Sequence, residues 1–429
     1  KFSDLHLPSP GDGKPDENNN SKLYSEHEYQ ILYKYAEKNW AHFNKIKVSA
    51  LITARVLEKN TYSDFSDFLL EQSNNLNLNI TKEDLDAVCE KFFEQYVYFD
   101  LLKYTGKTKY KPVTYKKCSI PMEKDKNRNE TRLNFCIKNS KVRFKNKDLY
   151  RLFCDYGVKR KNRNNFSDNL FYWILKQYIY EILPILVSGF WNKIAEISKG
   201  LPDLAMQMLG VHLRIGRKPF LDENASGEFQ KDGFAIIAED INLAIKLLRT
   251  YQEQWFLTLN DNQRKELGSE AHRHTLVVID SIKNPFESMY LKQRYSNYYL
   301  MGVYTEEVER ERRLLKKENF SSDEIQEIAQ IERLSQIKKA YKQFKQNQSE
   351  GKKSTLKQLC KMLERKNLYN ELPFISQNVE KCLEAADIFI NNDDDNRSLI
   401  SLKKTLLRYI CLIMYPGLLL PTPVERCMQ

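Results

Sequence analysis

Apolar side chains recur every three or four residues along much of this chain, which is the spacing of amphipathic helices. This spacing predicts packed helices over residues 25–70 and a long amphipathic helix over residues 234–248. One region departs from the helical period. There an apolar, β-branched run over residues 276–280 predicts a strand. A short segment that opens with Pro285 predicts a helix, and a second apolar run that ends at Tyr304 predicts another strand.

The order helix, strand, helix, strand is typical of α/β architecture. The segment from Ser281 to Ser296 is long enough to form the crossover between two parallel strands, which is expected to be right-handed. From Asn74 to Gly200 the chain mixes helical stretches with a basic, asparagine-rich middle. We therefore predict an α/β fold with a parallel sheet flanked by helices and a large, mostly helical insertion.

One apolar segment, Leu170 to Trp191, is long enough to span a bilayer. Lys176, Glu181 and Pro184 interrupt it, and the flanking residues show no anchoring pattern. These features favour a buried helix of a globular protein, so we expect no membrane partner.

Composition and charge narrow the class of protein further. The 429 residues are 41% hydrophobic, which is enough to bury a core, and their net charge of +11 favours anionic partners. The eight cysteines form no CxxC pair, so the sequence predicts neither a disulfide framework nor a zinc ribbon, and a reducing cytoplasm is expected. The polar N-terminus carries no signal-peptide pattern, and because it starts at Lys1 we expect upstream residues to be absent.

Asp280 is the first candidate site residue, because it ends a predicted strand. Ligands of open parallel sheets collect beyond the carboxyl ends of the strands, so a carboxylate there is placed to hold a metal ion, such as magnesium, or to face a phosphate. The alternative is that Asp280 caps the following loop through backbone amides.

Three arginines follow the second predicted strand. Arg310, Arg312 and Arg313 lie on a predicted helix that opens with Thr305 and two glutamates. Guanidinium groups at this place are suited to clamp phosphates, and an ordinary charged helix surface is the alternative interpretation.

Four further cations are nucleotide-binding candidates. Lys283 and Arg294 flank the predicted helix after Asp280, where surface charge is the alternative. Arg214 and Arg217 lie on either side of Gly216, a residue that allows close approach of the backbone to a ligand.

Four stretches of the sequence together resemble one family. They are MQMLGVHLRIGRKPF at Met206–Phe220, VVIDSIKNPFESMYLKQRYSNYYLMGVYTEEVERERRL at Val277–Leu314, QNVEKCLEAADIFINN at Gln377–Asn392 and YPGLLLPTPVERCMQ at Tyr415–Gln429. In this order they are similar to the bacterial anti-phage dCTP/dCMP deaminases, in which a P-loop kinase-like domain precedes a zinc-dependent cytidine-deaminase domain.

The resemblance implies a division of the chain. Residues 1–64 would form the N-terminal part of a kinase-like domain, residues 65–200 the helical basic insertion, and residues 201–345 the kinase-like α/β core. Residues 346–429 would form a helical segment and a linker toward a deaminase domain that is absent from this chain.

Two motifs of the family are missing from these residues. No GxxxxGK[ST] loop, which cradles phosphates with successive backbone amides, occurs in the sequence. Neither the HxE nor the PCxxC motif, which supply the zinc ligands and the proton-shuttling glutamate of zinc deaminases, occurs either. The resemblance therefore implies magnesium with a nucleotide as the cofactor of this chain, zinc only in the absent deaminase domain, and no catalytic residue here.

The leading hypothesis is a nucleotide-binding regulatory region of a deaminase that converts dCTP or dCMP to dUTP or dUMP and so depletes the nucleotides that phage need. Its expected partners are a nucleotide, an inhibitory RNA and further copies of the protein joined through the deaminase domain. The rival hypothesis, from the net charge and the 25 tyrosines, is a nucleic-acid-binding scaffold on a degenerate kinase fold, with RNA as the partner. An active small-molecule kinase is disfavoured by the missing phosphate loop.

Overall fold

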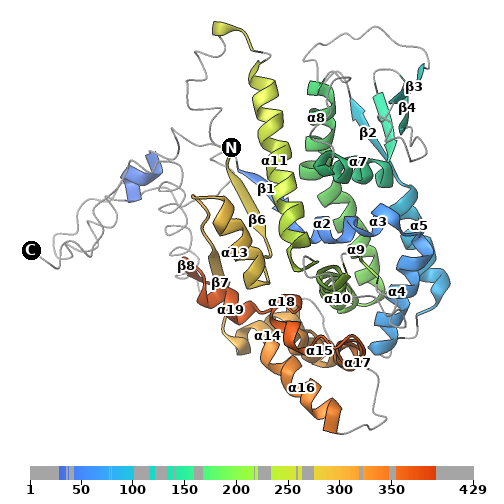
Figure 1. Cartoon of the computed structure of the whole chain (residues 1–429), viewed down its shortest axis with the longest axis vertical. Helices are drawn as coiled ribbons and strands as arrows, with labels where there is room; N and C mark the ends of the chain where they lie inside the picture. The colour runs from blue at the N-terminus through green and yellow to red at the C-terminus, as the bar shows by residue number, and fades with distance from the viewer. Residues whose placement is uncertain are drawn as a thin grey trace, which may run out of the picture.

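The computed structural model describes residues 29–34, 37, 43–100, 116–120, 133–158, 168–220, 233–262, 275–317, 322–346 and 354–392, apart from positions 77, 79, 139, 140, 217 and 258. The described part is mostly helical, with two pairs of short parallel strands and one four-stranded antiparallel sheet (Figure 1). An α/β class is consistent with these parallel pairs.

The predicted strand, helix and strand are confirmed as elements. They are β6 (Val277–Asp280), α13 (Pro285–Arg294) and β7 (Met301–Tyr304). Asn284 caps α13 by accepting a hydrogen bond from the Phe286 amide at 2.9 Å, and Pro285 occupies the first turn, where its missing N–H costs nothing.

The expected pairing of β6 with β7 is wrong. Among the described strands, β6 pairs in parallel with β1 (Asn44–Lys47), and β7 pairs in parallel with β8 (Ile388–Asn391). In the first pair Asp280 lies opposite Lys47. The crossover helix α13 therefore joins two separate parallel pairs, whose partners come from distant parts of the chain.

The largest hydrophobic core spans residues from Ile46 to Leu291. It joins helices on both sides of the predicted boundaries at residues 64 and 200, so these boundaries do not separate two cores. In Figure 1 the long helix α11 (Ile236–Leu257) runs through the centre of the molecule and packs against α2 (Val48–Ala54), α8 (Asp168–Gln177) and α13. The other helices of this core are α3 (Val56–Lys59), α4 (Tyr62–Asn75), α5 (Lys82–Glu94), α7 (Asn146–Val158), α9 (Leu183–Ile197) and α10 (Leu201–Gly216).

The apolar run from α8 to α9 belongs to this core. Over Leu170–Ile197 it is long and apolar enough to cross a membrane by length and composition alone. A π-helical segment, Tyr178–Ile182, joins the two helices and ends two positions before Pro184, which has no amide hydrogen to continue the preceding ladder. The helices α2, α5, α10 and α11 pack against this run, so its buried side chains lie inside the protein. This agrees with the prediction of a buried helix.

The predicted helical insertion also contains a sheet that the sequence did not indicate. The strands are β2 (Tyr96–Asp100), β3 (Lys116–Ile120), β4 (Leu133–Lys138) and β5 (Lys141–Lys145), in the antiparallel order β2-β5-β4-β3. On one face Val97, Phe99 and Phe144 are buried, and the Phe99 ring lies 6.0 Å from that of Trp173 on α8. This face anchors the sheet to the main core.

A second core forms between α10 and the C-terminal helices. Val211 and Ile215 of α10 pack with Ile337 and Leu363 in one cluster. Ile328 and Ile331 are buried in a further cluster with Leu204, so the helix that begins at Ser322 contributes to the core instead of leaving its apolar face for a subunit interface. The C-terminal helices are α14 (Glu307–Lys317), α15 (Ser322–Glu332), α16 (Leu334–Gln346), α17 (Thr355–Arg365), α18 (Leu372–Ile375) and α19 (Val379–Glu384).

His212 on α10 provides a test of the first core's packing. Burial lowers the pKa of His212 from 6.5 to about 4, although its Nδ1 donates a hydrogen bond to the Pro219 carbonyl at 3.2 Å. The neutral imidazole is therefore the form that stabilises the fold. This contribution is present above pH 6.5 and is lost as the pH falls through about 4.

We predict that the wild-type protein loses about 3 kcal/mol more stability over this pH window than His212→Gln does, because glutamine does not titrate. Urea denaturation at the two ends of the window measures the difference. Equal acid sensitivity of the two proteins would contradict the buried neutral imidazole.

Candidate functional site

The candidate site lies around the carboxyl ends of β1 and β6. Asp280 Oδ1 accepts a hydrogen bond from the Val48 amide at 2.8 Å, and its Oδ2 lies 3.2 Å from Lys45 Nζ. Ser281, the next residue, has a φ of 62°, which is uncommon for a residue other than glycine and turns the chain sharply away from β6. Asp280 thus acts as a cap, as the alternative interpretation held, but the amide belongs to α2 and not to the loop after β6.

The connection between β1 and α2 shapes this edge. Lys47 is the last residue of β1 and Val48 is the first residue of α2, so no loop and no glycine separate strand from helix. Lys47 Nζ donates a hydrogen bond to Ser188 Oγ on α9 at 2.6 Å. A strand that enters a helix directly leaves no turn of successive amides around a phosphate.

Two of the predicted cations meet on one carboxylate. Lys283 Nζ lies 3.1 Å from Glu332 Oε1, and Arg310 Nη2 lies 2.6 Å from Glu332 Oε2. The Glu332 side chain is 14% exposed, whereas those of Lys283 and Arg310 are 37% and 38% exposed. Burial alone would raise the pKa of Glu332, but the charges of the two cations and the hydrogen bonds from them outweigh burial and hold this pKa below its ordinary value. We call these three residues the Glu332 junction.

The Glu332 junction connects the two strand regions. Lys283 follows the end of β6, and Arg310 lies on the helix that follows β7. One predicted cation from each strand region is thus joined to the other through a glutamate that the sequence did not single out, while the contacts of Asp280 are with Val48 and Lys45. One carboxylate faces two cations, so the junction keeps an excess positive charge that solvent reaches from the side of the cations.

The remaining predicted arginines have other partners. Arg312 and Arg313 both bind Glu309, at 2.6 Å and 2.8 Å, and their hydrogen bonds lower the pKa of Glu309 to about 2. Arg313 also donates to the Asn392 carbonyl after β8 at 2.6 Å. Arg294 is exposed at the end of α13, where its guanidinium lies 3.4 Å from the centroid of the Tyr290 ring. None of these four contacts involves a residue of the Glu332 junction.

Arg214 is enclosed in the protein interior. Its Nε and Nη2 donate to Glu287 Oε1 at 2.9 Å and 2.7 Å, and its Nη1 donates to the Ile375 carbonyl at 3.3 Å. Only 3% of the Arg214 side chain and 1% of the Glu287 side chain are exposed. This buried ion pair connects α10 to α13 and α18, and it leaves Arg214 turned away from solvent. Arg217 lies outside the described residues.

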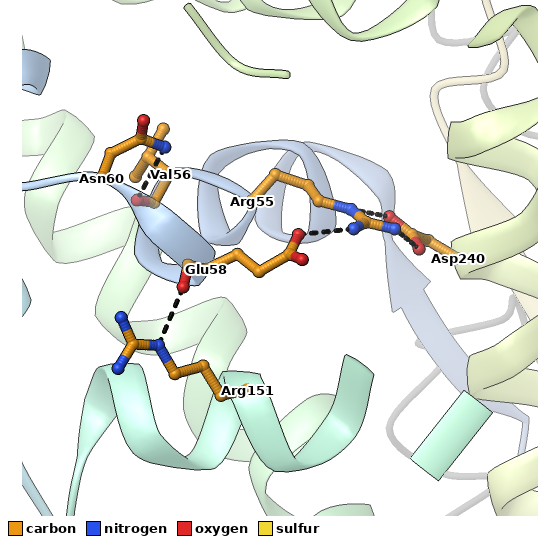
Figure 2. Close-up of polar contacts among 6 residues, drawn as sticks. All are labelled: Arg55, Val56, Glu58, Asn60, Arg151 and Asp240. Atoms are coloured by element: carbon orange, nitrogen blue, oxygen red, sulfur yellow. Dashed lines mark hydrogen bonds and ion pairs between the residues drawn. The ribbon is translucent and has the colours of Figure 1, made fainter. Parts of the chain in front are cut away.

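A second buried ion pair was missed by the sequence analysis. Figure 2 shows Arg55, between α2 and α3, donating from Nε and Nη2 to the two carboxylate oxygens of Asp240 on α11. Arg55 also binds Glu58, whose carbonyl accepts a hydrogen bond from Arg151 of α7 at 2.8 Å. Burial by itself would lower the pKa of Arg55, but the facing carboxylate of Asp240 raises it above its ordinary value. The sequence signal for this pair was Asp240 itself, a charged residue among the apolar positions of a helix.

In the part of the chain that is described, no three His, Cys, Asp or Glu side chains come together as metal ligands. His272, His274 and the Tyr415–Gln429 stretch lie outside the described residues, and so does the chain beyond Asn392.

Comparison with other proteins adds no relative: no protein-family model, curated protein or solved structure matches this chain.

The pair in Figure 2 gives a stability prediction. Asp240→Asn should cost about 3 kcal/mol, because it leaves the buried Arg55 guanidinium without the carboxylate that compensates its charge. Glu58→Gln, which removes the more exposed partner of the same arginine, should cost less than about 1 kcal/mol. Urea denaturation of both variants checks this order, and a reversed order would show that Asp240 is not the partner on which Arg55 depends.

Proposed function

We propose that this chain is the nucleotide-binding, kinase-like regulatory region of an anti-phage deoxycytidine nucleotide deaminase. In this proposal the chain binds the phosphates of a nucleotide at the carboxyl edge of β1 and β6 and does not transfer a phosphoryl group. The deamination of dCTP or dCMP to the uracil nucleotide would take place in a zinc-dependent domain whose motifs are outside these 429 residues.

The observation that carries the proposal is the Glu332 junction. A lysine from the tip of β6 and an arginine from the helix after β7 converge on a single anion, and both cations remain more than one-third exposed. Phosphate oxygens have the charge and the acceptor geometry to take the place of this carboxylate. The chain's own glutamate therefore holds the cations in position until a phosphate displaces it.

The direct connection of β1 to α2 supports a regulatory role over an active kinase. Kinases that use a glycine-rich loop surround the phosphates with backbone amides. Here the first amide of α2 already donates to Asp280. Binding through two side-chain cations without that cradle is suited to a site that senses a nucleotide.

Asp280 is placed to contribute one ligand to a magnesium ion bound with the nucleotide. Its Oδ1 is engaged by Val48, which leaves Oδ2 beside the exposed Lys45. Magnesium in nucleotide sites commonly takes one or two carboxylates, with phosphate oxygens and water as the other ligands. Asp280 Oδ2 would supply the protein ligand, and a cytoplasmic homo-oligomer joined by the deaminase domain remains the expected context.

We predict that Glu332→Gln raises the affinity for dCTP about tenfold, because the phosphates no longer compete with a carboxylate for Lys283 and Arg310. Isothermal titration calorimetry of the whole chain with dCTP, dCMP and inorganic phosphate measures the change. Glu196→Gln is the matched control, since Glu196 pairs with Lys193 on the exposed face of α9 and should leave the affinity unchanged.

The double variant that carries both Lys283→Ala and Arg310→Ala should bind dCTP at least tenfold more weakly in the same titration. A thermal unfolding curve for each variant establishes that it is folded. Unchanged affinity in both the Glu332 and the double variant, in folded protein, would rule out the Glu332 junction as the nucleotide site.

A separate prediction concerns Asp280. Asp280→Asn keeps an oxygen that accepts from Val48 but removes the negative charge, so α2 should stay capped while the magnesium-dependent part of nucleotide affinity is lost. Calorimetry with magnesium and with a chelator separates the two contributions. If magnesium strengthens dCTP binding equally in the variant and in the wild type, Asp280 is not the metal ligand.

A further inference from the structure

The antiparallel sheet of the insertion has a second face that the core does not use. In Figure 1 this sheet lies beside α7 and α8. Along β2, Val97 and Phe99 point into the core, and the alternating Tyr96 and Tyr98 are 41% and 59% exposed. We call the side of the sheet that carries these two tyrosines the outer face.

The exposed tyrosines are not required to fill the core. Their strand neighbours already bury the inner face against Trp173 and α8. Two large aromatic rings two positions apart on a strand lie about 7 Å from one another along the sheet. Rings at this spacing on an open sheet present flat apolar surfaces to a ligand.

Basic residues accompany the tyrosines. The Arg143 guanidinium lies 4.4 Å from the centroid of the Tyr96 ring, and Lys145 binds Glu94 at the edge of the same face. By register, Tyr98 is opposite Arg143, and Tyr96 is opposite Lys145. Each of the two rings on β2 therefore has a cation opposite it on β5.

Arg143 and Lys145 give the described part of this face its positive charge. Both lie on β5, opposite the two tyrosines of β2. Lys145 pairs with Glu94, and Arg143 adds a second cation beside the Tyr96 ring. Two cations thus face one carboxylate, and their charge complements that of a polyanion.

Sheet faces with exposed aromatic rings and surrounding cations are suited to single-stranded nucleic acid. Unpaired bases stack on the rings, and the cations neutralise the phosphates along the strand. A duplex hides its bases from such rings, and an acidic peptide has no flat bases to place on them. The sheet, three strand spacings or about 14 Å wide, offers room for a few nucleotides.

We propose that the outer face of the β2-β5-β4-β3 sheet binds single-stranded nucleic acid by stacking bases on Tyr96 and Tyr98 beside Arg143 and Lys145. This surface is separate from the Glu332 junction and does not depend on nucleotide binding there. It gives the protein a second anionic ligand, recognised by base stacking as well as by charge.

Fluorescence anisotropy with labelled 12-nucleotide single strands of RNA and of DNA tests the proposal on the whole chain. Tyr98→Ala should weaken binding about tenfold, the loss expected for one stacked base. Tyr299→Ala is the matched control, because Tyr299 is 51% exposed on a different part of the chain. The RNA and DNA arms show which sugar the face prefers, and binding of either strand supports the site.

A charge reversal provides the second readout. Lys145→Glu should weaken binding and make the slope of log affinity against log salt shallower by about 0.7, the value for one lost phosphate contact. Lys193→Glu, which likewise reverses a lysine paired with a nearby glutamate, should leave the affinity within about twofold, because Lys193 lies on α9 and not on the outer face of the sheet.

Three results would overturn the proposal. The first is that each variant and its control change the affinity equally. The second is that an unlabelled duplex competes for the protein as well as an unlabelled single strand does. The third is that a polyglutamate peptide displaces the oligonucleotide at an equal concentration of charge. Calorimetry with dCTP distinguishes this surface from the nucleotide site, because Tyr98→Ala should leave dCTP affinity unchanged.

Discussion

The buried ion pair between Arg214 and Glu287 is the contact on which the arrangement of the molecule depends. Arg214 belongs to α10, the helix that contributes to both large cores, and Glu287 belongs to α13, the crossover between the two parallel pairs. Both charges are removed from water, so each is tolerated only because the other is in place. The further hydrogen bond to Ile375 brings α18 to the same point.

Next to this ion pair, the backbone at Gly233, just before α11, lies close to the backbone at the end of α10. A Cβ atom added at Gly233 would lie 2.5 Å from the carbonyl oxygen of Arg214, a separation that no side chain tolerates. Glycine at this position therefore allows the start of α11 to lie against the end of α10. The ion pair itself holds α13 against α10, and Lys283 lies just before α13 in the chain.

The two proposed ligand surfaces use charge in different ways. At the Glu332 junction, cations are held by an internal carboxylate, which keeps them ordered and makes binding an exchange of one anion for another. On the outer face of the antiparallel sheet, cations surround exposed rings, so affinity arises from stacking together with neutralisation. A protein with both surfaces would respond to small nucleotides and to nucleic acid through separate contacts.

Sequence periodicity determined the local elements of this protein. The strand at residues 277–280, the helix opened by Pro285 and the long helix before them follow from the spacing of apolar side chains, because that spacing depends only on near neighbours. The tertiary structure alone decided which strands pair, that the insertion contains a sheet, and which carboxylate each cation meets. Asp280 and the Val48 amide are 232 positions apart, and Lys283 and Glu332 are 49 apart, so no local pattern records these contacts. They arise from the path of the chain, which is set by the burial of many side chains at once.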